Sequence, residues 1–140
     1  MKAYLNRRYR FSASHRLHND QWSDDKNLAT YGKCNNPHGH GHNYVLEVRL
    51  SGPVNPDTGM VCNLSDLDTF INRRIIEGFE LSNLNALPAF KAEVPTTENL
   101  CRELFKIIED GFSLAKLEKI RIEETAMNSF EFAGGREIPE

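Results

Sequence analysis

The chain has 140 residues, of which 39% are hydrophobic, and its formal net charge at pH 7 is −3. This length suits one domain spanning residues 1–140, and the charge provides no basic field that would favour nucleic acid or an anionic membrane as a partner. No apolar run approaches the ~18 residues of a membrane span and no signal-peptide core follows Met1, so membrane, collagen-like, coiled-coil and disordered classes are excluded.

Two segments in the first half of the chain alternate between apolar and polar residues, which predicts two strands that each bury one face. In residues 8–17 one side carries Tyr9, Phe11, Ala13, His15 and Leu17. In residues 42–51 one side carries His42, Tyr44, Leu46, Val48 and Leu50. The polar connection between them is expected to contain a short helix over residues 23–29, with Ser23 as its N-cap. A connection this long is more often functional than filler.

Two longer helices are predicted in the second half of the chain. Apolar residues recur at close to helical spacing over residues 64–79. A second helix is expected to begin after Thr96 or Thr97 as its cap, to run to about Asp110 and to end at Gly111.

Two strands close the chain, over residues 118–125 and 129–132, and the tail at residues 136–140 is expected to fray. The predicted order is β-β-α-α-β-β, which indicates an α+β fold without repeats.

All five histidines fall within residues 15–42: His15, His18, His38, His40 and His42. His40 and His42 are two residues apart and point to the same side of an extended backbone, while His15 lies on the apolar side of the first strand. If these strands pair, three imidazoles converge at one end of the buried face. Three neutral histidines with one open position are typical of a catalytic zinc site. The alternative is that each histidine is separately a polar loop or core residue.

Glu124 is in phase with Ile120 and Ile122, so its carboxylate is expected on the buried face. A buried charge needs a cation, hydrogen-bond donors or a ligand, and a ligand with paired N–H donors would suit this one. The alternative is that the side chain reaches solvent at the strand end.

Three cysteines at wide spacing argue against a disulfide framework and for a reducing cytoplasm. Cys62 and Cys101 lie among apolar or helical residues and are expected to pack as small hydrophobic side chains. Cys34 differs, because it lies in a polar turn at residues 32–37 where a thiol gains little from packing.

Five motifs, in order from residue 11 to residue 125, resemble the 6-pyruvoyl-tetrahydropterin synthase / 6-carboxytetrahydropterin synthase family. They are residues 11–17 (FSASHRL), 32–37 (GKCNNP) with 39–44 (GHGHNY), 58–61 (TGMV) with 63–67 (NLSDL), 95–99 (PTTEN), and 124–125 (ET). The resemblance implies the tunnelling fold (T-fold), a four-stranded antiparallel sheet with two helices on one face. It also implies a homohexamer, a dimer of trimeric barrels, with active sites between subunits.

The resemblance further implies a role for each candidate residue. The residues implied to hold Zn²⁺ are His15, His40 and His42, and those implied to line the pterin pocket are Thr96, Thr97, Glu98 and the pterin anchor Glu124. Cys34 matches the catalytic thiol that moves protons on the substrate side chain. The implied substrate is 7,8-dihydroneopterin triphosphate. Elimination of triphosphate would give a 6-pyruvoyl- or 6-carboxy-tetrahydropterin, so the chain is expected to be a carbon–oxygen lyase.

One departure from the family pattern concerns the base that would activate Cys34. The family's Asp-His pair before an Asn-Leu is replaced by Glu80 and Leu81, and leucine cannot carry a proton. Glu80 and His38 are the candidate replacement bases, although His38 also fits a solvated loop. Alternatively, the reaction has shifted to side-chain cleavage giving 6-hydroxymethyl-dihydropterin, or the chain binds pterin with weakened catalysis. The product and the pathway (queuosine, biopterin or folate) stay open.

Overall fold

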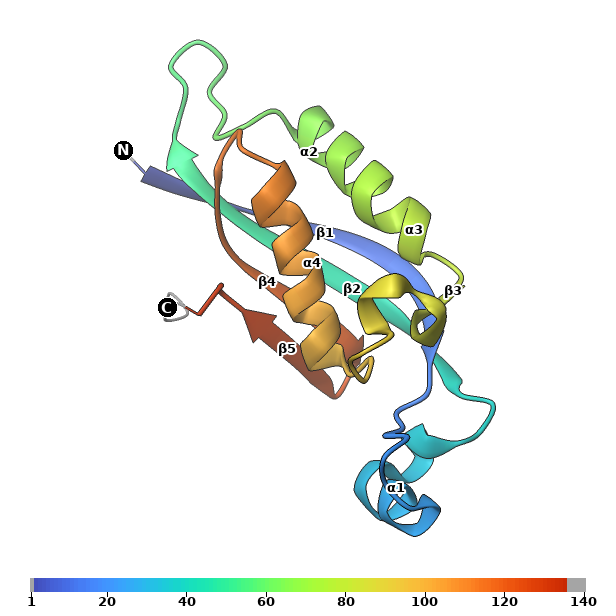
Figure 1. Ribbon diagram of the computed structural model, residues 1–140. Helices are drawn as coiled ribbons and strands as arrows, with labels where there is room; N and C mark the ends of the chain where they lie inside the picture. Colours follow the sequence, from blue (N-terminus) through green and yellow to red (C-terminus); the bar gives the residue numbers. More distant parts are fainter. Residues whose placement is uncertain (1, 136–140) are drawn as a thin grey trace.

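A computed structural model describes residues 2–135 of the chain. Met1 and residues 136–140 lie outside the described part, and so does the expectation for the tail. In chain order the helices and strands are β1 (Lys2–His15), α1 (Asp24–Tyr31), β2 (His40–Pro53), α2 (Leu64–Ile71), a π-helical turn (Asn72–Ile76), α3 (Glu77–Phe79), β3 (Ser82–Asn83), α4 (Thr97–Gly111), β4 (Lys116–Thr125) and β5 (Asn128–Phe132), with 3-10 turns at Gly32–Asn35, Leu84–Ala86 and Pro88–Phe90 (Figure 1).

The sheet has the strand order β3-β1-β2-β4-β5. Its four long strands are antiparallel, which confirms the α+β class and the predicted order. The expectation of four strands misses β3, a two-residue strand parallel to the end of β1. This strand forms because the chain leaving α3 is held against β1, where the Leu81 N–H donates to the Ser12 carbonyl at 2.6 Å.

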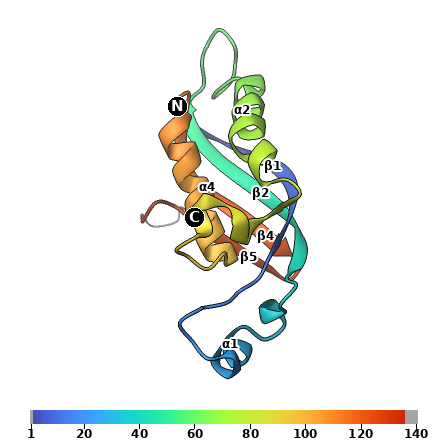
Figure 2. The same cartoon turned by 45° about the vertical axis from the view of Figure 1, so that its right-hand side comes forward.

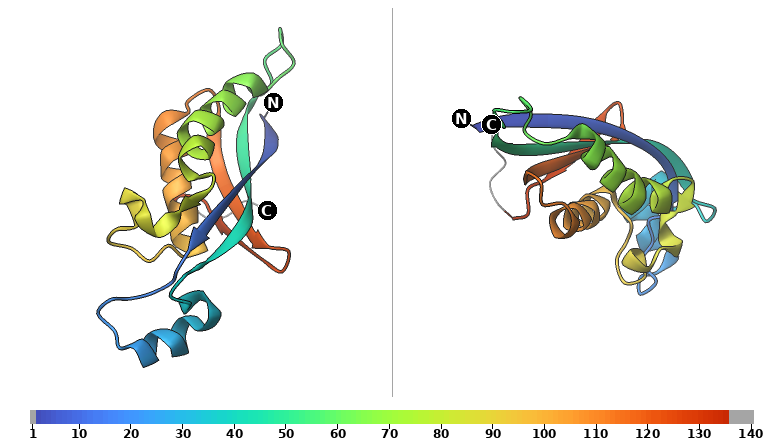
Figure 3. Two further views of the ribbon diagram at one scale, coloured as in Figure 1. Left: turned by 90° about the vertical axis from the view of Figure 1, so that its right-hand side faces the viewer. Right: turned by 90° about the horizontal axis from the view of Figure 1, so that it is seen from above.

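Both long helical segments, α2 to α3 and α4, cover the same face of the sheet (Figure 3). The inward side chains of the strands and the apolar stripes of these helices form one core, which includes Phe11, Tyr44, Leu46, Leu67, Ile71, Leu104, Ile108, Ile120 and Ile122. The alternation read from the sequence is confirmed for Phe11, Ala13 and His15, which are all buried on β1. The strand begins earlier than expected, at Lys2, and ends at His15, so Leu17 lies outside it.

Gly111 does not end α4 in the expected way. Gly111 is the last residue of α4, and its φ is not positive. The N–H that caps the helix belongs to the next residue, Phe112, and it donates to the Ile108 carbonyl. Glycine is needed for packing instead, because a Cβ at residue 111 would lie 2.6 Å from Cε2 of Phe70.

The connection between β1 and β2 extends beyond the end of the sheet and carries α1 (Figure 2). As expected, Ser23 caps α1, accepting from the Lys26 N–H at 3.1 Å. Within the connection, Asn27 of α1 is fully buried, and it donates to the Asn19 carbonyl and accepts from the Asn19 N–H. None of the helices in residues 2–135 is long and apolar enough to cross a membrane.

Candidate active site

The three histidines on the predicted buried face converge at the end of β1 and β2. His15 and His40 are direct partners in the strand pairing. The Nε2 atoms of His15 and His40 are 3.2 Å apart, those of His40 and His42 are 3.0 Å apart, and the three ligand nitrogens all lie within 4.8 Å of one another. This cluster could hold a metal ion.

Hydrogen bonding and burial prepare His15 to act as a neutral ligand. Its Nδ1 lies 2.8 Å from the Pro95 carbonyl, which can only accept, so Nδ1 carries the proton and Nε2 presents a lone pair. Burial lowers the pKa of both His15 and His42 below the ordinary value, which favours the neutral form that binds metal. The donor set therefore fits a zinc ion.

Gly39 allows the backbone to turn at this point. Its φ is +71°, and a Cβ there would lie 2.8 Å from the His15 carbonyl oxygen. Glycine at 39 thus accommodates the neighbouring strand. Gly41 has its nearest contact at an ordinary 3.5 Å from the Ala13 carbonyl.

Glu124 lies beside the histidines, on the face expected from its phase. The pairing of β4 with β5 shifts between Glu123 and Thr125, so Glu124 occupies an irregular position in the strand. Its Oε1 is 2.9 Å from Nε2 of His42, and its Oε2 accepts a hydrogen bond from the Thr97 hydroxyl at 2.6 Å. The carboxylate is mostly buried and held at both oxygens, which leaves its orientation defined. A metal on the His42 nitrogen would remove that donor and leave Oε1 available to another N–H.

Thr96 and Glu98, on either side of Thr97, are less buried than Thr97. Thr96 is the N-cap, and its hydroxyl accepts from the Asn99 N–H at 3.1 Å. Thr97 is buried, whereas Glu98 is exposed in the first turn of the helix.

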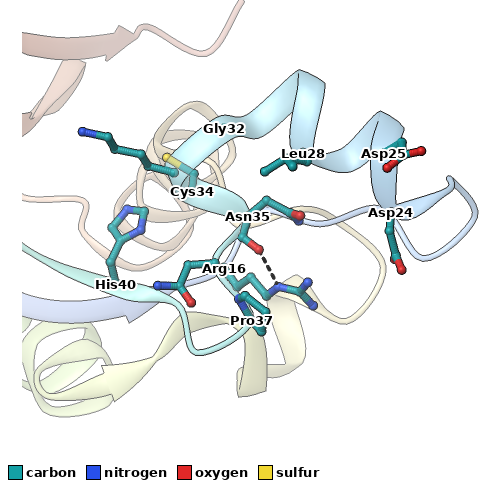
Figure 4. A pocket seen from close by; sticks show the side chains of 11 residues that line it. Arg16, Asp24, Asp25, Leu28, Gly32, Cys34, Asn35, Pro37 and His40 are labelled. Carbon is teal, nitrogen blue, oxygen red and sulfur yellow. Dashed lines mark hydrogen bonds between the residues drawn. The ribbon is translucent and has the colours of Figure 1, made fainter.

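Cys34 and His40 line the same hollow, of about 960 Å³, together with Arg16 and residues of α1 (Figure 4). Cys34 is half-buried, and its carbonyl accepts from the Leu17 N–H at 2.8 Å, which holds the turn against the end of β1. Burial, and then the negative charge of Glu124, raise the pKa of the Cys34 thiol. Within one chain this thiol is therefore protonated at neutral pH.

The two candidate bases do not share the Cys34 hollow. Glu80 lies at the edge of β1, where its Oε2 accepts from the Ser12 N–H at 3.1 Å. His38 is exposed and lines a smaller polar hollow with Ser14. Leu81 is 84% exposed and has a φ of +57°, a left-handed conformation that is unfavourable for leucine.

Sequence reasoning missed one contributor to the site. The Pro95 carbonyl sets the His15 tautomer, and only the fold brings it there from 80 residues away. Tyr44 is fully buried in the core, as expected from the face it shares with His42.

A family model and two relatives that match nearly the whole chain all carry the name of one family. The family model described as "PTPS: 6-pyruvoyl tetrahydropterin synthase" matches residues 4–135. The chain is 40% identical over 134 residues to 6-pyruvoyl tetrahydrobiopterin synthase of Homo sapiens, covering 95% of this chain and 92% of that protein. It is 42% identical over 136 residues to the Drosophila melanogaster enzyme of the same name, covering 94% and 80%.

A solved structure agrees with these sequence matches. The Caenorhabditis elegans 6-pyruvoyl tetrahydropterin synthase superimposes with a TM-score of 0.91 at 38% identity, covering 96% of this chain and 97% of that one. The family resemblance and T-fold expected from the five motifs are confirmed.

Proposed function

Because the chain belongs to the 6-pyruvoyl tetrahydropterin synthase family, we propose that it is a zinc-dependent pterin synthase acting on 7,8-dihydroneopterin triphosphate. It is an enzyme of tetrahydropterin synthesis, a carbon–oxygen lyase that eliminates triphosphate. Of the two products expected from the sequence, the 6-pyruvoyl form is favoured, since the human and Drosophila relatives that match nearly the whole chain carry that name.

One observation carries this proposal: the histidine cluster and a fixed carboxylate lie in contact, with 2.9 Å between His42 Nε2 and Glu124 Oε1. Zn²⁺ held by His15, His40 and His42 would supply Lewis-acid polarisation of substrate oxygen atoms. Glu124 would accept the paired N–H donors of the pterin ring, which fixes the ring and therefore the direction of its side chain.

Cys34 would move protons on the substrate side chain from its place beside His40. Its raised pKa means that a base has to be supplied. Glu80 and His38 stay the candidates, and since neither lines the Cys34 hollow of its own chain, either would act across a subunit boundary. Thr96 and Glu98, which flank the buried Thr97, would reach the pterin only at the rim of the pocket.

Such shared sites require an assembly, and we propose a homohexamer, a dimer of trimers, of single-domain chains in the cytoplasm. The exposure of Leu81, at the position of the usual relay histidine, supports contact with a neighbouring subunit.

A pterin-binding protein with weakened catalysis is the second candidate, because Leu81 offers no proton and the Cys34 thiol has a raised pKa. Incubation of zinc-loaded protein with 7,8-dihydroneopterin triphosphate, followed by mass analysis of the pterin, separates the candidates. We expect the 6-pyruvoyl product. Recovery of 6-hydroxymethyl-dihydropterin would indicate side-chain cleavage, and unchanged bound substrate would indicate a binding protein.

The double variant Glu80→Asp with Leu81→His then tests the relay. If catalysis is weakened by Leu81, this variant raises turnover sharply. If it abolishes an existing activity instead, Leu81 belongs to a changed mechanism.

A further inference from the structure

The backbone just after the candidate metal ligand His15 is held by a side chain from a distant part of the chain. β1 ends at His15, which is also the last residue of β1 that pairs with β2. Among residues 2–135 no strand pairs with Arg16, the next residue. Its N–H instead donates to Oδ1 of Asn85 at 2.7 Å, and its carbonyl accepts from Nδ2 of Asn85 at 2.8 Å. One carboxamide thus makes the two bonds that a neighbouring strand would make.

Asn85 is the last in a series of contacts along the outer edge of β1. In an extended strand the backbone groups of every second residue point to the same neighbour. At Ser12 both groups are bonded by residues 80–81, β3 then continues the pairing, and at Arg16 both groups are bonded by Asn85. The segment 80–85 therefore follows β1 to one residue past its end.

Asn85 presents its side chain from an anchored backbone. The preceding Leu84 is fully buried in the core, and the Asn85 N–H donates to the side chain of Asn83, the N-cap of the 3-10 turn Leu84–Ala86. Asn85 is itself exposed, yet its carboxamide is bonded back to the chain at both ends. The orientation of this carboxamide is therefore defined.

The two bonds fix the peptide group that follows His15. The Arg16 N–H and the His15 carbonyl belong to one planar unit. The other side of that unit is crowded, since a Cβ at Gly39 would lie 2.8 Å from the His15 carbonyl oxygen. The imidazole is held separately, at Nδ1, by the Pro95 carbonyl. Asn85 and Pro95 thus fix the two parts of the residue, its peptide group and its ring.

The direction of the His15 imidazole decides whether the cluster can share one ion. Zn–N distances are about 2.0–2.1 Å, so a bound ion tolerates little displacement of a ligand nitrogen. Nε2 of His15 lies 3.2 Å from Nε2 of His40. Because strand pairing ends at His15, rotation of the following peptide group would turn the Cα–Cβ bond and move Nε2 away. The Asn85 carboxamide opposes that rotation.

The same peptide group leads into the turn that carries Cys34. The Arg16 side chain donates through Nε to the Asn35 carbonyl at 3.2 Å (Figure 4). The Leu17 N–H donates to the Cys34 carbonyl at 2.8 Å. Asn85 therefore holds the junction between the histidine cluster and the candidate thiol.

We propose that Asn85 is a positioning residue for the metal site: its carboxamide fixes the peptide group between His15 and Arg16 and thereby the direction of the His15 imidazole toward the ion. This inference rests on the proposed function, in which His15, His40 and His42 hold zinc. It extends that function to a residue that touches neither metal nor substrate.

The test uses the full chain in its native assembly and Zn²⁺ alone, with the dissociation constant measured by competition against a chromophoric chelator. Asn85→Ala removes both bonds to Arg16 and is expected to weaken zinc binding about tenfold. Cobalt-substituted protein gives a second readout, because its visible absorption reports the ligand geometry. At full occupancy the spectrum of Asn85→Ala is expected to differ from that of the wild type.

The conservative variant Asn85→Asp separates the two bonds. Aspartate can still accept from the Arg16 N–H but cannot donate to the Arg16 carbonyl. We expect zinc binding about threefold weaker than in the wild type, a smaller loss than in Asn85→Ala.

Asn63→Ala is the matched control. The Asn63 side chain also bonds a backbone N–H, that of Ser65 at 2.8 Å, but it does so as the N-cap of α2. This variant is expected to melt at a lower temperature while its zinc affinity and cobalt spectrum stay at wild-type values.

Wild-type zinc affinity in Asn85→Ala, or in Asn85→Asp should the alanine variant not fold, would overturn the proposal. An equal loss of zinc affinity in Asn63→Ala would also overturn it, because the effect would then be general destabilisation. If the wild type itself binds no zinc at the histidines, the proposed function fails together with this inference. If the wild type binds zinc and the Asn85 variants bind it equally well, only this inference fails.

Discussion

His15 illustrates how single residues build the site. Its strand phase aims the imidazole at the core, the Pro95 carbonyl fixes its tautomer, and burial lowers its pKa. The first of these features follows from alternation in the sequence. The other two depend on tertiary contacts, so the sequence indicates His15 as a candidate ligand but not its tautomer or its lowered pKa.

Glu124→Gln tests the pterin anchor. Glutamine keeps the size but loses the charge that strengthens hydrogen bonds from N–H donors, so pterin affinity should fall about tenfold to hundredfold. Fluorescence titration with pterin measures this, with zinc content as a check. Glu123→Gln is the control, because Glu123 lies on the other face, 4.0 Å from Arg121. Equal losses in the two variants would contradict the anchor role.

Cys34→Ala tests the thiol. Zinc content is expected to stay intact and elimination to be lost, because the three histidines would hold the metal without the sulfur. Metal analysis and the product assay measure the two effects, with Cys62→Ala as the comparison. Loss of zinc from Cys34→Ala would make Cys34 a ligand and refute its assignment as proton carrier.

At the scale of helices and strands, alternation and capping predicted most of the fold. Ser23 and Thr96 cap the helices where expected. All four long strands overlap the predicted segments, although β1 starts at Lys2 and ends at His15 where residues 8–17 were expected. The sequence could not predict β3, because two residues of pairing leave no periodic pattern. The location of Glu80 at the edge of β1 was equally hidden, since it depends on where α3 ends against the sheet.

Two helical glycines should respond oppositely to alanine. Gly111→Ala would place a Cβ 2.6 Å from Phe70 and is expected to destabilise the chain by about 1–3 kcal/mol. Gly78, in α3, has open space around its Cα, so Gly78→Ala should stabilise by about 0.5–1 kcal/mol. Denaturant unfolding measures both. A stabilising Gly111→Ala would contradict the packing reason given for that glycine.

Glu118 links three strands and gives the fold an acid-sensitive contact. Its carboxylate accepts from the Ser51 hydroxyl at 2.5 Å and lies 3.2 Å from the Lys2 ammonium and 3.5 Å from that of Lys116. Above all the Ser51 hydrogen bond lowers the pKa of Glu118 from 4.5 to about 2.

Because the pKa of Glu118 is lower in the folded state, its ionised carboxylate stabilises the fold at pH values above the unfolded-state pKa. This stability is lost as the pH falls from 4.5 to about 2. The difference in unfolding free energy between wild type and Glu118→Gln should therefore shrink over that range. Chemical denaturation at a series of pH values measures it. A difference that stays constant down to pH 2 would contradict the contact's role.

At the scale of the whole molecule, the outer edges of the sheet have backbone groups that could pair with strands of another chain. Apart from β3 on the last residues of β1, no described strand pairs with the outer edge of β1 or of β5. Unpaired edges readily add strands from another chain. Met127, 93% exposed between β4 and β5, and Leu81 are apolar groups that an assembly would cover.

The proposed hexamer predicts a particle of about 96 kDa, six times the 16.0 kDa of the chain. Light scattering coupled to size-exclusion chromatography measures this mass directly. A stable monomer that turns over substrate would contradict sites completed by neighbouring subunits.

We propose that one site holds a metal ion on His15, His40 and His42 and the pterin on Glu124. A crystal structure of zinc-loaded protein soaked with pterin, with anomalous data at the zinc edge, tests it most directly. The expected result is an anomalous peak that places the zinc ion within bonding distance of Nε2 of His15, His40 and His42, with pterin N–H groups donating to the Glu124 carboxylate. An anomalous peak at other residues, or pterin bound away from Glu124, would contradict the account.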